Sequence, residues 1–339
     1  MIQLAGFFPI VLIALVTAVV LSPLAVHLAR RLGWVDVPGS APHKMHDVPT
    51  PLAGGPVIGL AILACYLLLQ PPVEASVLGM LAGAGLVAVG GMVDDRRGLS
   101  PLVKLAIQAA AAVIVIGAGV RVQVTGMEAL DLALTLLWII GMVNAFNFVD
   151  SMDGLALGLA GIAAAFFLLV TIDSGQPVLA VLSAAILGAA AGGFLYNASP
   201  AKLFLGDSGA QLLGFLLASL GIAYIPAGAG LPQAVSWFTP ILVLGVPLFD
   251  ITLVVLLRGL RREPVYRAGQ DHTYHRLLRL GLDPIRAVLM MHLAGVVLGL
   301  VAFMTLDASA LVANLVFAGV VLAGIGLVAL LGARTRTAD

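Results

Sequence analysis

Residues 88–104 read AVGGMVDDRRGLSPLVK and join two long apolar runs through a short charged turn. Asp94 and Asp95 end the first run, and Ser100-Pro101 opens the second as a helix N-cap followed by a proline at the first helical position. The chain has 339 residues, of which 61% are hydrophobic and only 10% charged. Apolar runs near the roughly 20 residues needed to cross a bilayer as a helix exclude an ordinary soluble domain.

About eleven such runs follow one another, each with the length of a transmembrane helix rather than that of a barrel strand. The expected fold is therefore an all-α polytopic membrane protein, with residues 1–339 forming a single integral domain. The expected spans are residues 6–29, 52–70, 74–93, 101–119, 131–147, 155–172, 177–196, 208–226, 234–257, 284–305 and 309–332.

Basic residues lie almost entirely on one side of these spans. With the N-terminus outside the cell, all of the 17 lysines and arginines except Arg121 fall in cytoplasmic segments, as the positive-inside rule requires. Changing the number of spans by one would scramble this bias, so the C-terminus is expected in the cytoplasm. Arg30 and Arg31 follow the first apolar run and no basic residue precedes it, so we expect a retained helix rather than a cleaved signal peptide.

Two of the expected cytoplasmic segments combine cations with glycines or carboxylates. In residues 43–55, Lys44 and the backbone N–H groups of Gly54 and Gly55 could contact an anion, and a loop whose cations reach lipid headgroups is the alternative. In residues 88–104, two adjacent aspartates end a helix, where the macrodipole disfavours negative charge. A cation is expected to compensate them, and the two arginines that follow could do so.

Two further segments carry aspartates at helix ends. Asn147, Asp150 and Asp153 are spaced by three, so a helical turn would align them on one face. Two carboxylates at hydrogen-bonding distance repel by about 4 kcal/mol at an effective dielectric near 20, so a cation or a donor-rich ligand is needed from elsewhere. Asp207, in the turn at residues 206–209, would lie at the mouth of a helix, either as a ligand or as a simple N-cap.

The fifth of these cytoplasmic segments, residues 258–286, contains seven arginines and the hexapeptide DHTYHR at residues 271–276. Histidines three apart beside arginines suit a diphosphate, whereas the arginines alone would suit anionic lipid. Asp250, about two turns before Arg258, is an intramembrane carboxylate. Such a group is either a functional residue or the structural partner of an arginine, and the sequence leaves both readings open.

Oxygen ligands dominate these segments, and a cysteine site is excluded because Cys65 is the only cysteine and lies in an expected span. Magnesium suits this inventory better than zinc, since it typically binds one or two carboxylates plus substrate phosphates, and manganese is an alternative. The implied chemistry is phosphoryl transfer, in which basic side chains hold phosphates while a metal neutralises developing charge.

In this order the five segments resemble the polyprenyl-phosphate N-acetylhexosamine-1-phosphate transferases, membrane enzymes that begin peptidoglycan, teichoic acid, O-antigen and related glycans. NFVDSMDG at residues 147–154 is the most specific motif, GDSG at residues 206–209 is moderately specific, and the aspartate pair alone is weak. The resemblance implies a helix bundle in the plasma (inner) membrane with a cytoplasmic cleft. There a polyprenyl phosphate attacks the sugar-linked phosphate of a UDP-N-acetylhexosamine and UMP leaves. It also implies no nucleic acid partner, and a homodimer is common in the family.

Carried over by motif, the resemblance gives each residue an expected role. Asp94 would hold or deprotonate the lipid phosphate, and the histidines would contact the diphosphate or sugar. The expected catalytic residues are Asp94, Asp95, Asp150, Asp153, His272 and His275; the expected substrate contacts are Lys44, Lys104, Asn144, Asn147, Gly206 and Arg276; and the expected magnesium ligands are Asp95 and Asp207.

Departures from the family pattern bear on the donor sugar. Asp95 is followed by Arg96-Arg97-Gly98, whereas the branch that uses UDP-N-acetylmuramoyl-pentapeptide usually has three histidines and a lysine soon after the aspartate pair. This favours the branch that loads N-acetylglucosamine 1-phosphate, with the pentapeptide branch as the alternative.

An ion-coupled transporter is the alternative from another class, but its site would lie near the bilayer midplane between inverted repeats, and no repeat is visible. Residues 150–154 also begin the motif of CDP-alcohol phosphotransferases, but the alanine-arginine pair that should follow is absent.

Overall fold

The computed structural model describes residues 3–38, 48–225, 237–264, 269 and 271–334, so Lys44 lies outside the described residues. Almost all regular structure in this part of the chain is helical. The helices are α1 (Gln3–Arg31), α2 (Gly54–Leu69), α3 (Ala75–Arg97), α4 (Pro101–Gly117), α5 (Glu128–Val149), α6 (Leu155–Asp173), α7 (Pro177–Asn197), α8 (Gly206–Ala223), α9 (Thr239–Val243), α10 (Gly245–Arg261), α11 (Thr273–Arg279), α12 (Pro284–Met304) and α13 (Ala310–Arg334), and the strands are β1 (Val35–Asp36) and β2 (Thr50–Pro51).

Seven helices in the described residues are long and apolar enough to cross a membrane, namely α1, α3, α5, α6, α7, α12 and α13. The shorter helices α2 and α4 are also apolar. A helix suits lipid because it satisfies its backbone N–H and C=O groups within one segment. The expectation of an all-α, multi-pass membrane protein is therefore confirmed.

The apolar run predicted as one span over residues 234–257 is divided between two helices. α9 ends at Val243, and α10 begins at Gly245 after a turn at Leu244. Pro247 explains the break, because proline has no N–H to donate to the carbonyl of Val243 and its ring crowds that carbonyl. The expectation of one continuous helix was wrong here.

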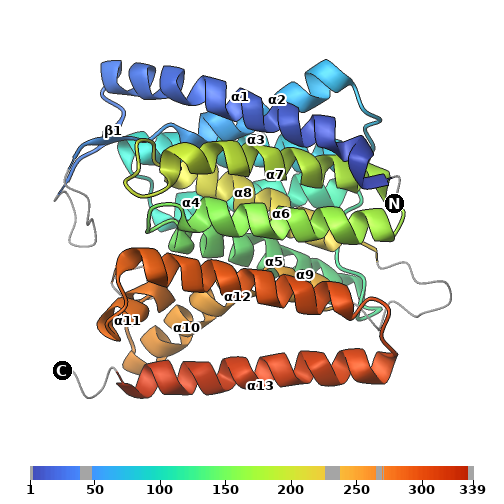
Figure 1. Ribbon diagram of the computed structural model, residues 1–339. Helices are drawn as coiled ribbons and strands as arrows, with labels where there is room; N and C mark the ends of the chain where they lie inside the picture. Colours follow the sequence, from blue (N-terminus) through green and yellow to red (C-terminus); the bar gives the residue numbers. More distant parts are fainter. Residues whose placement is uncertain (1–2, 39–47, 226–236, 265–268, 270, 335–339) are drawn as a thin grey trace.

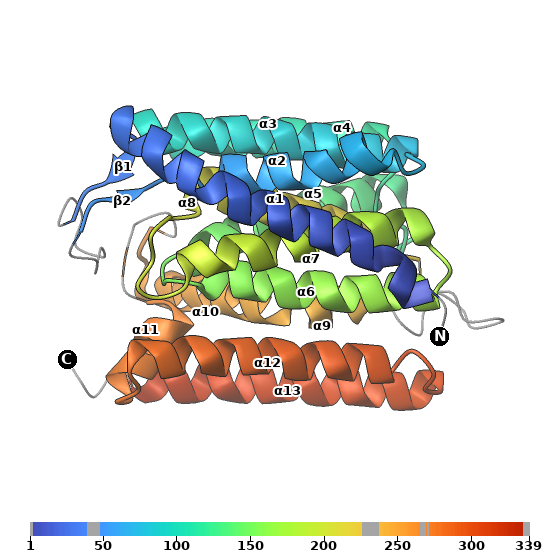
Figure 2. The ribbon, with the colours of Figure 1, turned by 45° about the horizontal axis from the view of Figure 1, so that its top comes forward.

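The long helices run along a common direction, with β1, α11 and the C-terminal end of α13 at one end of the bundle and the start of α1 at the other (Figure 1). α13 lies at the edge of the bundle, below α12 in both views (Figures 1 and 2). α8 is central, since nearly all its side chains are buried and it packs against α2, α3 and α5. The N-terminus of α8 therefore meets several other helix ends.

Two glycines open α2 directly against the segment that leads into α8. The Gly54 N–H donates to the carbonyl of Phe204 at 3.0 Å, and the Gly55 N–H donates to that of Leu205 at 3.1 Å. A Cβ at position 55 would collide with the Ser208 side chain, so a larger residue cannot approach in this way. The expectation that these N–H groups contact an anion was wrong, because they already pair two chain segments.

Candidate active site

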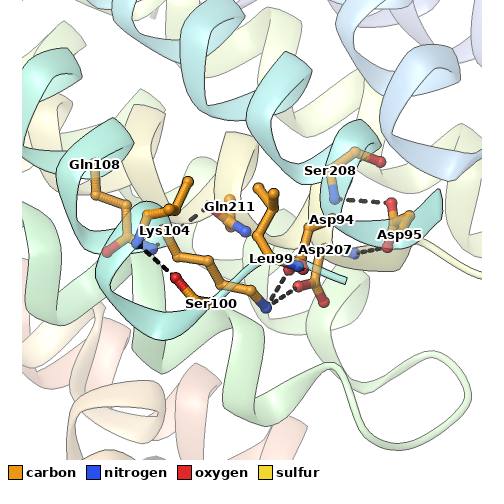
Figure 3. A network of polar contacts seen from close by, with 10 residues as sticks. Asp94, Asp95, Leu99, Ser100, Lys104, Gln108, Asp207, Ser208 and Gln211 are labelled. Carbon is orange, nitrogen blue, oxygen red and sulfur yellow. Dashed lines mark hydrogen bonds and ion pairs between the residues drawn. The ribbon is translucent and has the colours of Figure 1, made fainter. Parts of the chain in front are cut away.

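The N-terminus of α8 lies against the C-terminal ends of α3 and α5. Asp95, near the end of α3, accepts the Asp207 N–H at 2.8 Å through Oδ1 and the Ser208 N–H at 3.2 Å through Oδ2 (Figure 3). Asp150, just after α5, accepts the N–H of Gly206. The first N–H groups of a helix have no partner within it, and carboxylates suit the positive end of its dipole. Two of the predicted carboxylates therefore hold the start of α8.

Lys104 is the cation that compensates the aspartate pair. Its Nζ lies 2.8 Å from Oδ2 of Asp207 and also contacts Oδ2 of Asp94 (Figure 3). The carboxyl groups of Asp94 and Asp207 contact each other as well, so a shared cation offsets their repulsion. Arg96 and Arg97, which the sequence left open for this role, are exposed at the end of α3.

The turn after α5 separates two aspartates that were expected on one helical face. α5 ends at Val149, and the turn closes at Gly154, whose φ of +77° favours glycine. Asp153 accepts the Ala201 N–H at 3.0 Å and so faces the segment that leads into α8. The predicted alignment of Asp150 with Asp153 by helical spacing was therefore wrong, although both residues still lie near the start of α8.

Negative charge is concentrated around Asp150. Burial raises the pKa of its carboxyl well above the usual value, and the neighbouring charges of Asp207, Asp95 and Asp153 raise that pKa further. Asn147, from the same motif, donates a hydrogen bond to Asp207. Lys104 contacts Asp207 and Asp94 but none of the other three aspartates, so acidic groups outnumber basic ones in the described cluster. Such a cluster attracts a further cation.

A second polar layer lies one helical turn deeper in the bundle. Asn144 donates its amide to Oε1 of Gln108 at 2.8 Å, and Nε2 of Gln108 lies 3.5 Å from Oε1 of Gln211. Gln108 follows Lys104 by four residues on α4, and Gln211 follows Asp207 by four on α8. Sequence reasoning missed both glutamines, although polar residues four apart in apolar helices are a usable signal. Asn144, a predicted substrate contact, here ties α5 to α4.

His292 on α12 was also missed. Its Nε2 lies 3.2 Å from the carbonyl of Leu155, at the end of the turn that carries two of the predicted aspartates. The imidazole occupies space that Gly158 leaves open, because a Cβ at that position would collide with the ring. An ionisable side chain inside an apolar span was the signal that could have identified it.

α11 begins beside a buried carboxylate on α10. Oδ2 of Asp250 lies 2.8 Å from Nδ1 of His272, and Oδ1 accepts the Thr273 N–H at 2.6 Å. Arg258 instead pairs with Asp271, with 3.1 Å between Nε and Oδ2. The partner of Asp250 is thus a histidine rather than the arginine that the sequence also allowed.

His275, on α11, is a buried neutral imidazole. Burial lowers its pKa to about 4, and the charges of His272 and Arg279 act in the same direction. Its Nε2 lies 2.6 Å from the hydroxyl of Tyr274, whose pKa burial raises to about 12. Its Nδ1 has no hydrogen-bond partner among the described residues. His275 could therefore offer one neutral ring nitrogen to a ligand.

Phe148 connects the histidines of the α11 segment to the aspartate cluster. The rings of Phe148 and His272 meet edge to face with 5.3 Å between their centroids, and the rings of His272 and His275 are 5.8 Å apart. Phe148 stands between Asn147 and Asp150 in the sequence. All the predicted segments in the described residues therefore meet at one end of the bundle.

Arg276, a predicted diphosphate contact, is only 2% exposed and is used in packing. Its Nη1 donates to the carbonyl of Leu331 at 2.9 Å, and its Nε donates to the carbonyl of Asp271 at 3.0 Å. The bond to Leu331 ties α11 to the last turn of α13, and the bond to Asp271 holds the segment just before α11. The contact with a diphosphate stays a prediction, and the bonds described here do not depend on it.

The described carboxylates could hold a magnesium ion only if substrate supplied part of its shell. Within the described residues, no three His, Cys, Asp or Glu side chains form a group that could hold a metal ion by themselves. Magnesium usually keeps several waters and takes one or two carboxylates plus substrate phosphates. Asp207 and Asp94 supply hard oxygen ligands at the helix mouth, whereas both oxygens of Asp95 already accept N–H groups of α8.

Gly91 allows α3 to approach the start of α8, and its replacement is a test of this packing. A Cβ there would lie 2.5 Å from the Cα and the N of Ser208, whereas a Cβ at Gly85 on the same helix would meet nothing within 4 Å. We expect Gly91→Ala to lower the free energy of unfolding by about 1–3 kcal/mol, because backbone atoms must shift. Gly85→Ala should be neutral or slightly stabilising. Thermal unfolding in detergent measures both, and equal melting temperatures for Gly91→Ala and wild type would contradict the packing described.

Comparison with known proteins gives consistent matches. The model of "Glycosyl transferase family 4" matches residues 77–225, which hold the aspartate motifs from α3 to α8. A probable undecaprenyl-phosphate N-acetylglucosaminyl 1-phosphate transferase of Bacillus subtilis is 31% identical over 88% of this chain and 84% of the relative. A decaprenyl-phosphate N-acetylglucosaminephosphotransferase of Mycobacterium tuberculosis is 34% identical over 81% and 76%. An undecaprenyl-phosphate alpha-N-acetylglucosaminyl 1-phosphate transferase of Escherichia coli is 26% identical over 80% and 76%.

Proposed function

The chain belongs to the polyprenyl-phosphate N-acetylhexosamine-1-phosphate transferases of glycosyl transferase family 4, and we propose on that premise that it transfers N-acetylglucosamine 1-phosphate to a polyprenyl phosphate. The donor would be UDP-N-acetylglucosamine, the acceptor undecaprenyl phosphate or a relative of it, and the second product UMP. The relatives' names specify N-acetylglucosamine, which favours this donor over UDP-N-acetylmuramoyl-pentapeptide. The reaction would be the first membrane step of a cell-envelope glycan.

One observation carries the proposal: Lys104 lies between Asp94 and Asp207 at the mouth of α8. A lysine beside two carboxylates can meet a phosphate while the carboxylates accept a proton or bind a metal. The cluster lies where several helices begin or end. An ion-coupled transporter would instead be expected to place its carboxylates near the bilayer midplane, on broken helices.

The residues present can divide the transfer between them. An oxygen of the lipid phosphate attacks the phosphorus that carries the sugar, the bond from that phosphorus to the UMP oxygen breaks, and a lipid diphosphate sugar forms. Asp94, beside Lys104, would hold the lipid phosphate and take its proton. Asn147, at the end of α5, and Asp150 and Asp153, on the turn that follows, would position the nucleotide. His272 and His275 would contact the diphosphate or the sugar.

Magnesium is the expected cofactor of this reaction, with manganese as a substitute. Asp207 is the side chain best placed to hold it, since its carboxylate lies in the first turn of α8 and is not used to cap that helix. Asp95 could bind the ion only if one of its oxygens gave up the hydrogen bond that it accepts from the Asp207 or Ser208 N–H. When bound, the ion would neutralise charge that develops on the phosphates.

For the membrane topology we propose about eleven spans with the N-terminus outside and the C-terminus in the cytoplasm. The positive-inside bias, in which Arg121 alone of the 17 basic residues falls outside, supports this orientation. The site would then lie at the cytoplasmic face of the plasma membrane and open to the cytoplasm, where UDP-sugars are available.

A direct assay tests the function. Detergent-purified protein supplied with undecaprenyl phosphate, UDP-N-acetylglucosamine and magnesium should release UMP, and the lipid product should gain N-acetylglucosamine 1-phosphate. Chelation by EDTA should stop the release, and added magnesium should restore it. A panel of UDP-N-acetylglucosamine, UDP-N-acetylgalactosamine, UDP-glucose and UDP-N-acetylmuramoyl-pentapeptide determines the donor. Failure of every donor to yield UMP would overturn the proposed function.

A further inference from the structure

Asp250 is a buried carboxylate to which the proposed reaction assigns no role. It lies in α10 and is 1% exposed. A buried charge at such a place is costly unless it is paired and hydrogen-bonded. Both of its oxygens are engaged, Oδ2 with Nδ1 of His272 at 2.8 Å and Oδ1 with the Thr273 N–H at 2.6 Å.

This pairing restricts the imidazole of His272 to one arrangement of hydrogens. An ionised carboxylate only accepts hydrogen bonds, so the hydrogen of the ring must be on Nδ1. Nε2 then carries no hydrogen and is left to accept a hydrogen bond or a proton from a ligand. The edge-to-face contact with Phe148, at 5.3 Å between centroids, fixes the ring beside the end of α5.

We propose that Asp250 is a positioning residue, which holds His272 in the Nδ1–H form from within α10 and so presents Nε2 to the diphosphate of the UDP-sugar. The inference rests on the proposed function, because it assigns His272 to that substrate. The adjacent His275 supports the choice of ligand. Its Nδ1 is buried without a hydrogen-bond partner among the described residues, and its ring is 5.8 Å from that of His272. A substrate oxygen near both rings would give Nδ1 of His275 a partner, and a hydroxyl or protonated phosphate of the substrate could donate to Nε2 of His272.

The substitution Asp250→Asn tests this assignment with almost no change in shape. The backbone N–H of Thr273 can only donate, so the asparagine oxygen must face it. The asparagine amide then donates to Nδ1 of His272, and the hydrogen of the neutral ring moves to Nε2. We expect UMP release to fall by about 10²-fold or more, which is the scale of a positioned acid or base.

Nitrogen-15 spectra of histidine-labelled protein provide a readout besides activity. The chain has six histidines, and loss of one signal in His272→Gln assigns that of His272. Wild-type protein should show the Nδ1–H form, and Asp250→Asn the Nε2–H form. An Nε2–H form in the wild type overturns the proposal even if the Asp250→Asn protein cannot be recovered.

Asp271→Asn is the matched control, because Asp271 precedes His272 in the chain yet pairs with Arg258 and Arg261 rather than with the ring. It should leave the tautomer of His272 unchanged. When His272→Gln is already present, adding Asp250→Asn should lower the activity by less than about threefold, because the effects of two coupled residues are not additive. The proposal would be overturned if the double variant lost activity by the product of the two single losses, or if Asp250→Asn alone kept full activity. If the wild type released no UMP from any donor, the proposed function would fail, and the nitrogen spectra alone would still decide whether Asp250 sets the tautomer.

Discussion

The substitution Asp207→Asn is expected to lower the rate of UMP release by about 10²–10³-fold, the scale seen when one preorganised polar group at a reacting centre is removed. Oδ2 of Asp207 lies 2.8 Å from Nζ of Lys104, and Asn147 donates a hydrogen bond to the same carboxylate, so an amide would remove the charge on which the ion pair depends. An amide oxygen is also a weaker magnesium ligand than a carboxylate. The rate is measured with detergent-purified protein at saturating magnesium.

Fold and stability should survive this change. The Asp207 side chain does not cap α8, whose first N–H groups are bound by Asp95 and Asp150. The partly exposed ion pair with Lys104 contributes about 1 kcal/mol or less to stability. Asp283→Asn is the matched control, because Asp283 caps α12 through an N–H bond from Arg286 that asparagine can keep. Asp207→Asn activity within threefold of that control would rule out an essential role for the carboxylate.

The substitution Asp95→Asn should have a different signature, since it is expected to reduce both activity and stability. Each oxygen of Asp95 accepts an N–H from the start of α8, at 2.8 Å from Asp207 and at 3.2 Å from Ser208. Asparagine offers one oxygen and places its amide against the second donor. We expect the free energy of unfolding to fall by about 1–3 kcal/mol and UMP release to fall by about 10²-fold.

Comparison of the two variants separates capping from metal binding. If Asp95 mainly caps α8, its variant should melt at a lower temperature than Asp207→Asn, and added magnesium should not restore its activity. Recovery of wild-type activity at high magnesium, with an unchanged melting temperature, would show that Asp95 acts as a metal ligand instead. Thermal unfolding and a magnesium titration of UMP release measure both quantities on the same preparations.

Much of the candidate site could be predicted because its residues follow apolar runs in recognisable motifs. Asp94, Asp207 and Asn147 were identified in this way, and the structure brings them together around Lys104. The pairing of charges could not be predicted. Arg96 and Arg97 are nearest to the aspartate pair in sequence, but the compensating cation comes from the next helix, where Lys104 faces the start of α8.

Local spacing also failed where a helix ended early. Asn147 and Asp153 seemed to share a helical face, but α5 stops at Val149 and Asp153 binds the Ala201 N–H. The partner of Asp250 could not be predicted either, because residues 258–286 contain several arginines and two histidines that could pair with it, and only the packing of α11 against α10 selects His272. A side chain selects its partner by distance, and distance between segments is set by packing.

The sequence by itself determined that this protein is an all-α membrane protein of a known transferase family, since apolar length, charge placement and motif order belong to single segments. Only the tertiary structure decided what each polar group does. Glycines at 55 and 91 allow α2 and α3 to reach the first turn of α8, and this close approach places Asp95 against its N–H groups. Hydropathy acts along one helix, whereas hydrogen bonds and ion pairs require two groups within about 3 Å of each other.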